Sequence, residues 1–341
     1  MKKIASLILC FILLCGCRAL ETSQKQYTAT FLDLFDTVTT IVGKAESKEA
    51  FEESLKPLHE SLEYYHKLFD IYNEYDGITN LKTVNDKAFV APVVVDAAIL
   101  DLIEDCKEYY TATNGRFNPA LGSVLSLWHT AREDGINDPE NAYLPDTDKL
   151  LSAKEHTNPD DIVLDREKST VFFKDADLKL DVGGIAKGWA VERVSKTAPE
   201  GLLISVGGNV YATGPKDKNG TPWAVGVRNP DSSSDGDYLH ILNIKDGSVV
   251  TSGSYIRAYA VNGKLYHHII DPDTLYPGEK WTSVTVVCDD SGLADVLSTA
   301  LFLLDCKDGQ QLLDKYKADA MWVDAKGNKY YSPDFKDLIR N

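Results

Sequence analysis

The sequence is short of basic residues. Its 341 residues contain 36 Lys and Arg against 52 Asp and Glu, which gives a formal net charge of −16 at pH 7. An acidic surface repels phosphate backbones, so the charge balance argues against nucleic acid as a partner. An anionic ligand would need a local source of positive charge, such as a metal ion, a helix N-terminus or a group of backbone N–H groups.

Cysteine is also scarce, and its spacing matches no metal site. Three of the six cysteines lie close to the N-terminus, and the other three are far apart in apolar contexts. We expect this second group to be buried free thiols, with one disulfide among them as the alternative. The six are Cys10, Cys15, Cys17, Cys106, Cys288 and Cys306.

Long apolar runs are missing except at the N-terminus. Lys2 and Lys3 precede an apolar stretch over residues 4–15, which is typical of an export signal and too short to span a membrane as a stable helix. The stretch ends in Leu14-Cys15-Gly16-Cys17, which resembles a bacterial lipobox. In a lipobox the chain is cut before the last cysteine, which carries the lipid. An ordinary signal peptide with chance cysteines is the alternative.

The lipobox resemblance predicts the organisation of the chain. Residues 1–16 would be a lipoprotein signal peptide, and Cys17 would be lipidated. The protein would then be an exported bacterial lipoprotein, anchored to the cell membrane through Cys17 and facing the extracytoplasmic side. Residues 18–29 are interpreted as a tether and residues 30–341 as the functional domain.

The rest of the chain has an ordinary globular composition, 43% hydrophobic and 26% charged. Apolar residues at helical spacing predict helices over 47–68 and 96–112, after a β-type run over 31–42. Later helices are expected near 187–197, 292–305 and 309–317. Later strands are expected at 178–182, 202–206, 223–227, 239–244, 255–261, 283–288 and 320–323. This order predicts an α+β fold, a single compact domain in which N-terminal helices pack with a mainly antiparallel sheet.

The segment Leu180–Trp189 predicts a strand, a glycine-rich turn and a helix start. Asp181 precedes a Gly-Gly pair that includes Gly184, and Lys187 falls in the first helical turn. Glycine lets a ligand approach the backbone, and a helix N-terminus offers free N–H groups to a phosphate. A phosphate-binding turn and a purely structural turn fit this segment equally well. For Val206–Asn209 a structural turn is the simpler interpretation.

Two adjacent histidines, His267 and His268, follow a polar turn at 251–255. Neighbours on a strand point to opposite faces, so one of the pair would enter a site while the other packs or meets solvent. A histidine of near-neutral pKa is a suitable base for a hydroxyl group. A structural or surface pair is the alternative, and the residues alone do not choose between the two histidines.

Asp295 and Thr299 lie four positions apart in an otherwise apolar predicted helix, so they share one helix face. A carboxylate and a hydroxyl are oxygen ligands, suited to Mg²⁺ or Ca²⁺ rather than Zn²⁺. The alternative is an Asp near the helix N-terminus and a Thr bonded back to the i−4 carbonyl. Earlier in the chain, Thr113–Pro119 fits a helix cap, although Phe117 could line a pocket there.

Taken together and in this order, these segments resemble the family of FAD:protein FMN transferases, the ApbE-type lipoproteins. The resemblance runs from about residue 35 to about residue 325. The matching segments are 35–37, 69–85, 114–118 with Trp128, 180–189, 206–209, 251–253, 268–272 and 294–300.

The resemblance implies an ApbE-like, T-fold-related domain and a specific reaction. Such enzymes cleave FAD at its pyrophosphate, attach FMN through a phosphoester bond to a Thr or Ser of a target protein, and release AMP. The targets are flavin-carrying subunits of membrane or extracytoplasmic redox systems. FAD is therefore the expected substrate and Mg²⁺ the expected cofactor.

The resemblance also implies roles for single residues. The metal ligands fall on the backbone carbonyl of Gly184 and the side chains of Asp295 and Thr299, and the catalytic base falls on His268. The residues expected to contact FAD are Phe35, Tyr72, Arg116, Phe117, Asn118, Asp181, Lys187 and Ile269.

The sequence departs from the family pattern at three positions. Leu275 stands where the family often has Gly, and leucine enters positive φ less readily, so we expect that turn to differ. Phe35 stands in a segment where the family has Met-Gly-Thr. Ser298 stands where some members carry a second acidic ligand, which argues against a second metal site.

Two other functions compete with flavin transfer. An FAD pyrophosphatase would share the fold but use water in place of the protein hydroxyl and release free FMN and AMP. A solute-binding lipoprotein would bind its ligand without turnover and without a metal. The Asp295–Thr299 pair, Lys187 and His268 argue against a pure binder.

Overall fold

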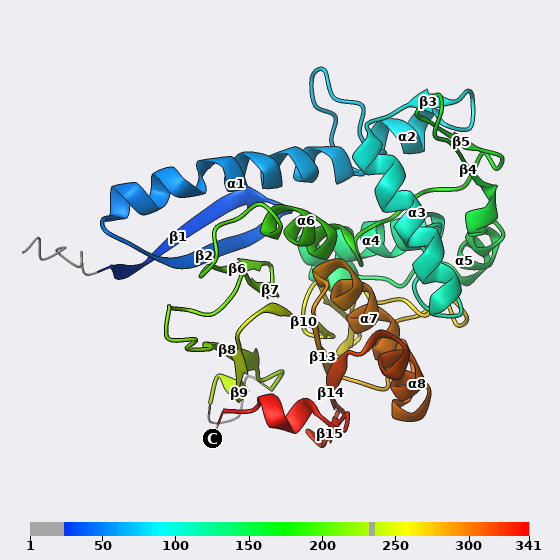
Figure 1. The fold of residues 1–341 in the computed structure, drawn as a ribbon. Coiled ribbons are helices and arrows are strands. Elements are labelled where there is room, and N and C mark those ends of the chain that lie inside the picture. The colour runs from blue at the N-terminus through cyan, green and yellow to red at the C-terminus, as the bar shows by residue number, and fades with distance from the viewer. Residues whose placement is uncertain (1–23, 232–235, 341) are drawn as a thin grey trace, which may run out of the picture.

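An eight-stranded antiparallel sheet forms the centre of the computed structural model, which describes residues 24–231 and 236–340 (Figure 1). The strand order is β1-β2-β6-β7-β10-β13-β14-β15, and each neighbouring pair runs antiparallel. The strands are β1 Lys25–Leu34, β2 Thr37–Ala45, β6 Leu203–Val206, β7 Asn209–Ala212, β10 Gly247–Gly253, β13 Ser283–Cys288, β14 Asp319–Val323 and β15 Lys329–Tyr331.

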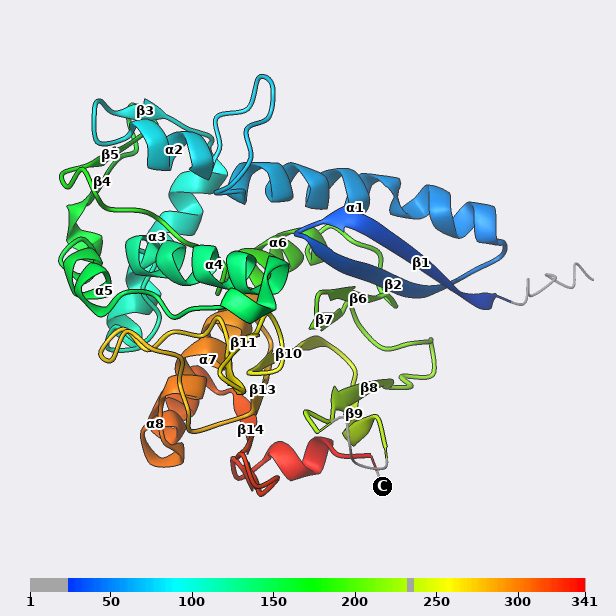
Figure 2. The ribbon, with the colours of Figure 1, turned by 180° about the vertical axis from the view of Figure 1, so that it is seen from behind.

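Helices cover one face of this sheet. They are α1 Lys48–Phe69, α6 Ala186–Ser195, α7 Ser291–Leu303 and α8 Cys306–Tyr316. α1 lies along the β1–β2 hairpin in both ribbon views (Figures 1 and 2) and buries Phe51 and Leu55 against it. α7 and α8 pack on β13 and β14 around Phe302 and Trp322. The apolar residues at helical spacing therefore form the buried stripe of α1, as predicted.

The opposite face of the sheet is covered by a hairpin and a short helix. These are β8 Trp223–Arg228 paired with β9 Tyr238–Ile244, and the 3-10 helix η3 Phe335–Leu338. Because successive side chains on a strand point to opposite faces, Val249 of β10 packs against this layer while Val250 packs against α7. The central strands β10, β13 and β14 are thus buried on both faces.

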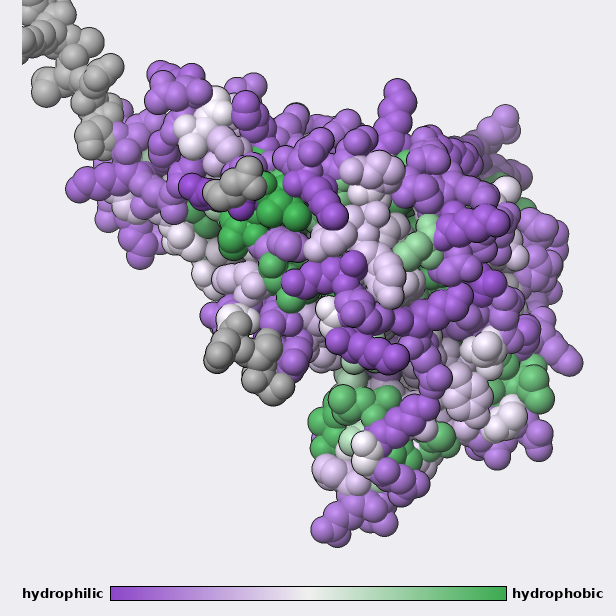
Figure 3. Space-filling model, turned by 90° about the horizontal axis from the view of Figure 1, so that it is seen from below, coloured by the Kyte–Doolittle hydropathy of each residue, from purple (hydrophilic) through white to green (hydrophobic). Residues whose placement is uncertain are grey.

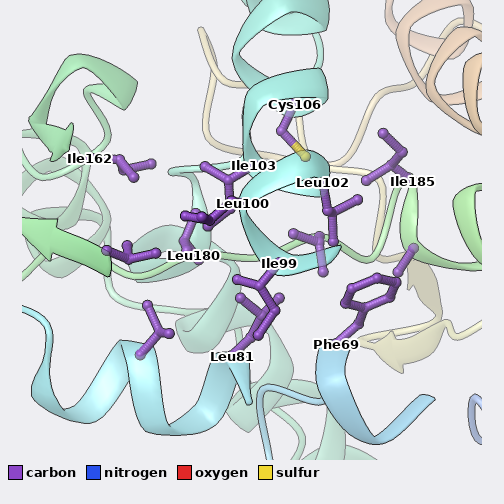
Figure 4. Packing of buried hydrophobic residues seen from close by; sticks show 14 of the residues in the cluster. Phe69, Leu81, Ile99, Leu100, Leu102, Ile103, Cys106, Ile162, Leu180 and Ile185 are labelled. Carbon is purple, nitrogen blue, oxygen red and sulfur yellow. The ribbon is translucent and has the colours of Figure 1, made fainter. Parts of the chain in front are cut away.

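A second helical layer stands beside the sheet. It contains α2 Leu81–Lys87, α3 Ala97–Ala112, α4 Gly122–Asn137, α5 Thr147–Lys154, η1 Pro139–Asn141 and η2 Pro159–Asp161. A small sheet, β3 Val93–Val94, β5 Thr170–Phe173 and β4 Ile162–Asp165, closes it, and the hairpin β11 Tyr259–Val261 with β12 Lys264–Tyr266 lies against α4. Figure 4 shows Ile99 and Ile103 near the middle of its core, between Ile162 on one side and Ile185 on the other.

The α+β class predicted from the sequence is confirmed, and most of the predicted helices and strands are present. The strand expected over 178–182 is wrong. The amide of Asn85 accepts from the N–H of Leu180 at 2.7 Å and donates to its C=O at 2.9 Å. A side chain thus takes the place of a neighbouring strand. The strand expected over 255–261 is wrong in its first half, because only Tyr259–Val261 pairs.

We expected the turn at Leu275 to differ from the family pattern, because leucine enters positive φ less readily than glycine. Leu275 nevertheless adopts the left-handed conformation, with φ of 64°. Its side chain is buried beside α4, and the indole N–H of Trp128 donates to its carbonyl at 2.9 Å. Packing and this hydrogen bond therefore hold a conformation that leucine adopts at a local cost.

The thiols of Cys106, Cys288 and Cys306 are free, and the first two are buried, which overturns the disulfide alternative. Burial raises the pKa of the Cys288 thiol to about 11, so this sulfur is inert at neutral pH.

Over residues 24–231 and 236–340, the helices lack the combination of length and hydropathy that a membrane span requires. Polar residues dominate the face seen from below (Figure 3).

The predictions for the N-terminus lie outside the described residues. These are the signal peptide over 1–16 and the lipid on Cys17. β1 begins at Lys25, inside the segment 18–29 that was interpreted as a tether. Any tether therefore ends before this strand.

Candidate active site

One pocket collects loops that are far apart in the sequence. Its volume is about 480 Å³, within the usual range for a small-molecule site. The β1–β2 turn, the start of α6, β10 and α7 meet α4 and the loop after β12 around it. Every residue that the resemblance assigned to catalysis, to FAD or to the metal lines this pocket. Folding thus brings together positions from Phe35 to Thr299.

The β1–β2 turn forms one wall of the pocket. Phe35 and Asp36 are left-handed, with φ of 52° and 50°. The N–H of Phe35 donates to Nδ1 of His66 in α1 at 3.1 Å, and the two rings meet edge-on. Left-handed backbone costs a non-glycine residue roughly 1–2 kcal/mol. Strain of this kind concentrates at functional sites.

The turn before α6 forms a second wall. Oδ1 of Asp181 accepts from the N–H of Gly183 at 2.8 Å. Burial raises the pKa of the Asp181 carboxyl, and this hydrogen bond opposes the rise. Within the part of the chain that the structure describes, no side chain caps the α6 N-terminus at Ile185, so the helix presents its first turn to the pocket.

Asp295 projects from α7 toward that turn and is only 4% exposed. Its Oδ2 accepts from the N–H of Gly188 at 3.0 Å and from Nζ of Lys187 at 3.3 Å. Both of these hydrogen bonds from described residues end on Oδ2, so Oδ1 is available for a ligand. Thr299 donates to the Asp295 carbonyl at 3.3 Å, so the back-bonded alternative is also realised.

Gly184 completes this group of oxygen donors. A Cβ placed on Gly184 would stand 3.3 Å from Oγ1 of Thr299, so the two residues are immediate neighbours. The hydroxyl of Ser298 is fully buried, donates to the carbonyl of Asp295 at 2.9 Å and lies 2.8 Å from Oγ of Ser252. Ser298 therefore adds no ligand to the pocket.

The two histidines have different surroundings. Both ring nitrogens of His267 are used, because Nε2 lies 2.8 Å from the carbonyl of Gly278 and Nδ1 accepts from the N–H of Ile269. His267 is buried edge-on against Phe302. Neither histidine lies in a strand, since β12 ends at Tyr266. The strand-based argument for opposite faces was therefore wrong.

His268 faces the pocket with one nitrogen free for chemistry. Its Nδ1 lies 3.1 Å from the carbonyl of Ile256. A carbonyl only accepts, so Nδ1 carries the proton and Nε2 keeps its lone pair. Burial, followed by the nearby Arg257, lowers the pKa of His268 to about 3. The ring is therefore neutral at physiological pH.

Two predicted FAD contacts have side chains bound to protein. Arg116 bonds to Asp271 at 3.0 Å and to Asp273 at 2.7 Å, which ties it to the loop after His268. Asn118 donates to the carbonyl of Thr157 and accepts from the N–H of Ala120. These side chains hold loops together, whatever else they do.

Three predicted FAD contacts offer ring or aliphatic surface. Phe117 and Ile269 are buried apolar walls of the pocket. Tyr72 is 51% exposed and stacks on His129, with ring centroids 4.7 Å apart. Aromatic surface of this kind suits the flat ring systems of a flavin nucleotide.

Sequence reasoning missed several basic groups of the pocket. Nη2 of Arg132 lies 2.9 Å from Nδ1 of His129, and burial lowers the pKa of His129. Arg257, left-handed with φ of 48°, lies in a segment expected to be a strand. The wall holds four Lys or Arg and four Asp side chains, in contrast to the acidic chain as a whole. They are Arg116, Arg132, Lys187 and Arg257, and Asp36, Asp70, Asp181 and Asp295.

A cluster away from the pocket also contains possible metal ligands. Ligand atoms of His156, Asp175 and Asp177 lie within 4.8 Å of one another. Nδ1 of His156 lies 2.8 Å from Asp175, and this hydrogen bond raises the pKa of the imidazole. The ion pairs of His156 with Asp175 and Asp177 explain the cluster without a metal ion.

Known proteins resemble this chain over most of its length. The ApbE family model matches residues 34–322. A protein of Treponema pallidum named FAD:protein FMN transferase is 33% identical over 261 residues, covering 71% of this chain and 70% of the relative. One of the same name from Klebsiella pneumoniae is 30% identical over 270 residues, covering 75% and 81%.

Solved structures support the same fold. The crystal structure of the ApbE protein from Thermotoga maritima has a TM-score of 0.80 and 29% identity, covering 93% of this chain and all of that one. The flavin transferase ApbE of Vibrio cholerae has a TM-score of 0.75 and 21% identity, covering 92% and 99%. At that lower identity the likeness concerns the fold alone.

Proposed function

The chain belongs to the ApbE family, and on that premise we propose that it is a Mg²⁺-dependent FAD:protein FMN transferase. It would attach FMN to a Thr or Ser of a target flavoprotein and release AMP. The observation that carries the proposal is the content of the pocket. A neutral imidazole with a free nitrogen, His268, shares it with Lys187 and with the oxygen donors of Asp295 and Thr299.

In the proposed reaction the hydroxyl oxygen of the target residue attacks the phosphorus of the FMN half of FAD. The P–O bond to the AMP half breaks, and AMP leaves with the bonding electrons. Nε2 of His268 takes the hydroxyl proton, for which a positioned base contributes roughly 10²–10⁴-fold. The anionic diphosphate favours the protonated imidazole, so bound FAD would raise the pKa of His268 above its value in the free protein.

The residues in the pocket fit a magnesium ion. The carbonyl of Gly184, a carboxylate oxygen of Asp295 and the hydroxyl of Thr299 are hard oxygen donors from neighbouring segments. Bound there, Mg²⁺ would supply positive charge opposite the diphosphate and the departing AMP. Lys187 adds a fixed positive charge on the same side through its ion pair with Asp295.

The test is a covalent-transfer assay with the purified full-length chain. The protein is incubated with FAD, Mg²⁺ and a flavoprotein domain that carries a candidate acceptor Thr. A denaturing gel is then viewed under ultraviolet light. We expect a fluorescent acceptor band that disappears with EDTA and with a Thr→Ala acceptor.

The competing functions give different products in the same tubes. Free FMN and AMP without a labelled band, across several acceptors, would identify an FAD pyrophosphatase. FAD that stays intact despite tight binding would identify a binding protein. Either outcome would contradict the proposed transfer.

We also propose that the mature chain is an exported lipoprotein, anchored through Cys17, whose acceptors are extracytoplasmic flavoprotein subunits. The proposal rests on the lipobox resemblance of residues 14–17. Cells fed an alkyne fatty acid should label the wild-type protein and leave Cys17→Ala unlabelled. Equal labelling of the two proteins, or no labelling of either, would contradict lipid attachment at Cys17.

A further inference from the structure

Three buried side-chain atoms lack a hydrogen-bond partner among the described residues. They are Oγ1 of Thr39, Nδ2 of Asn209 and Oγ of Ser283. Leaving a buried donor unpaired costs about 1–3 kcal/mol. Asn209 differs from the other two because it lines the active-site pocket. It is 1% exposed.

The structure places the oxygen end of the Asn209 amide against its one described partner. Its Oδ1 accepts from the hydroxyl of Ser291, the first residue of α7, at 2.7 Å. That hydroxyl is in turn 3.2 Å from Oγ of Ser248 on β10. The oxygen end of the amide therefore points at α7, and the nitrogen end, with its two protons, is the unpaired one.

The unpaired nitrogen lies beside the proposed phosphate and metal site. A Cβ added to Gly188 would stand 2.9 Å from Nδ2 of Asn209 and 2.8 Å from Cβ of Asp295. Gly188 itself donates to Asp295, and Lys187 pairs with the same carboxylate. A fixed donor, a lysine and a carboxylate thus converge on one small part of the pocket wall.

We propose that Asn209 is a substrate-binding residue whose Nδ2 donates a hydrogen bond to a diphosphate oxygen of FAD bound beside Asp295. The inference rests on the proposed function for the identity of the substrate. A buried donor that has no partner among the described residues would be satisfied by an anionic oxygen on binding. Asn209 is placed for this by β7, which starts directly after the Gly207-Gly208 turn.

The experiment compares FAD with riboflavin, which has the same ring system and no phosphate. Dissociation constants are measured by flavin fluorescence on the full-length chain, with EDTA and separately with Mg²⁺. Asn209→Leu removes the donor and keeps the branching of the side chain. Asn209→Asp keeps the acceptor for Ser291 and puts a carboxylate oxygen where the donor was. Thr39→Val and Ser283→Ala remove the two unpaired atoms outside the pocket and are the matched controls.

We expect Asn209→Leu to weaken FAD binding about tenfold or more, and Asn209→Asp to weaken it further by repelling the diphosphate. Riboflavin affinity should stay within about twofold in both, because the ring contacts are untouched. The control variants should bind both flavins as the wild type does. Because Asn209→Asp keeps the hydrogen bond to Ser291, it tests the proposal even if the leucine variant folds poorly.

Unchanged FAD affinity in Asn209→Asp would overturn the proposal. An equal loss for FAD and riboflavin would also overturn it, because that pattern indicates a distorted pocket. Failure of the proposed function looks different. The wild type would then bind FAD without labelling an acceptor, while the selective loss of FAD binding would still assign Asn209 to the part of FAD that riboflavin lacks.

Discussion

Gly188→Ala tests the close packing of α6 on α7, on which the position of Asp295 depends. The added Cβ would lie 2.8 Å from Cβ of Asp295 and 2.9 Å from Nδ2 of Asn209. Its nearest neighbour would be the backbone carbonyl of Ser291, at a separation that real Cβ atoms do not show. A backbone atom cannot rotate away as a side chain can, so the two helices must separate.

The magnitude follows from two opposing effects. Alanine in a helix interior is favoured over glycine by about 1 kcal/mol. Overpacking of a close contact costs typically 1–3 kcal/mol, and the backbone clash places this variant at the upper end, about 3 kcal/mol. The net loss of stability is about 2 kcal/mol, which lowers Tm by about 3 °C for a domain of this size.

The assay combines thermal unfolding, followed by circular dichroism, with Mg²⁺-dependent FAD binding. Gly188→Ala should lower Tm and also weaken binding, because the N–H of Gly188 holds Asp295. Gly183→Ala is the control for stability, since its Cβ would meet only a side-chain oxygen of Asp181 at 3.1 Å. A Tm at or above that of the wild type in Gly188→Ala would refute the packing argument.

The remaining predictions concern the chemistry of the pocket. His268→Ala should retain FAD affinity within a few-fold and lose roughly 10²–10⁴-fold in covalent transfer; a normal rate in the folded variant would remove His268 as the base. Asp295→Ala should abolish the dependence of FAD binding on Mg²⁺ in a titration. An unchanged Mg²⁺ response would show that the metal does not bind at Asp295. Because the pKa of His268 is lowered to about 3, this ring stays neutral as pH falls through 6.5 in the free protein. The acid limb of kcat/KM should therefore lie well below pH 6.5, and a limb near 6.5 that His268→Gln removes would contradict the lowered pKa.

The lowered pKa of His268 also affects stability. Between about pH 6.5 and pH 3 this histidine takes up a proton in the unfolded chain and not in the folded one. Its contribution therefore makes the folded state less stable as pH falls through that window. The same substitution, His268→Gln, should flatten that part of the stability curve in urea unfolding.

The sequence by itself determined the elements whose signal is local. The apolar stripe over 47–68 became α1, and the β-type run over 283–288 became β13 with the same bounds. Asp295 and Thr299 share a helix face because four residues nearly complete one helical turn. Spacing along the chain is enough for such predictions.

The tertiary structure decided what depends on partners from distant segments. Leu180 is no strand residue because the amide of Asn85 takes its backbone hydrogen bonds. His267 and His268 are adjacent and chemically alike, and they differ because the N–H of Ile269 occupies the second ring nitrogen of His267. The unpaired nitrogen of Asn209 exists because Ser291 occupies the other end of its amide. A hydrogen bond joins two positions in space, and the order of residues in the chain does not specify which distant group will supply the partner.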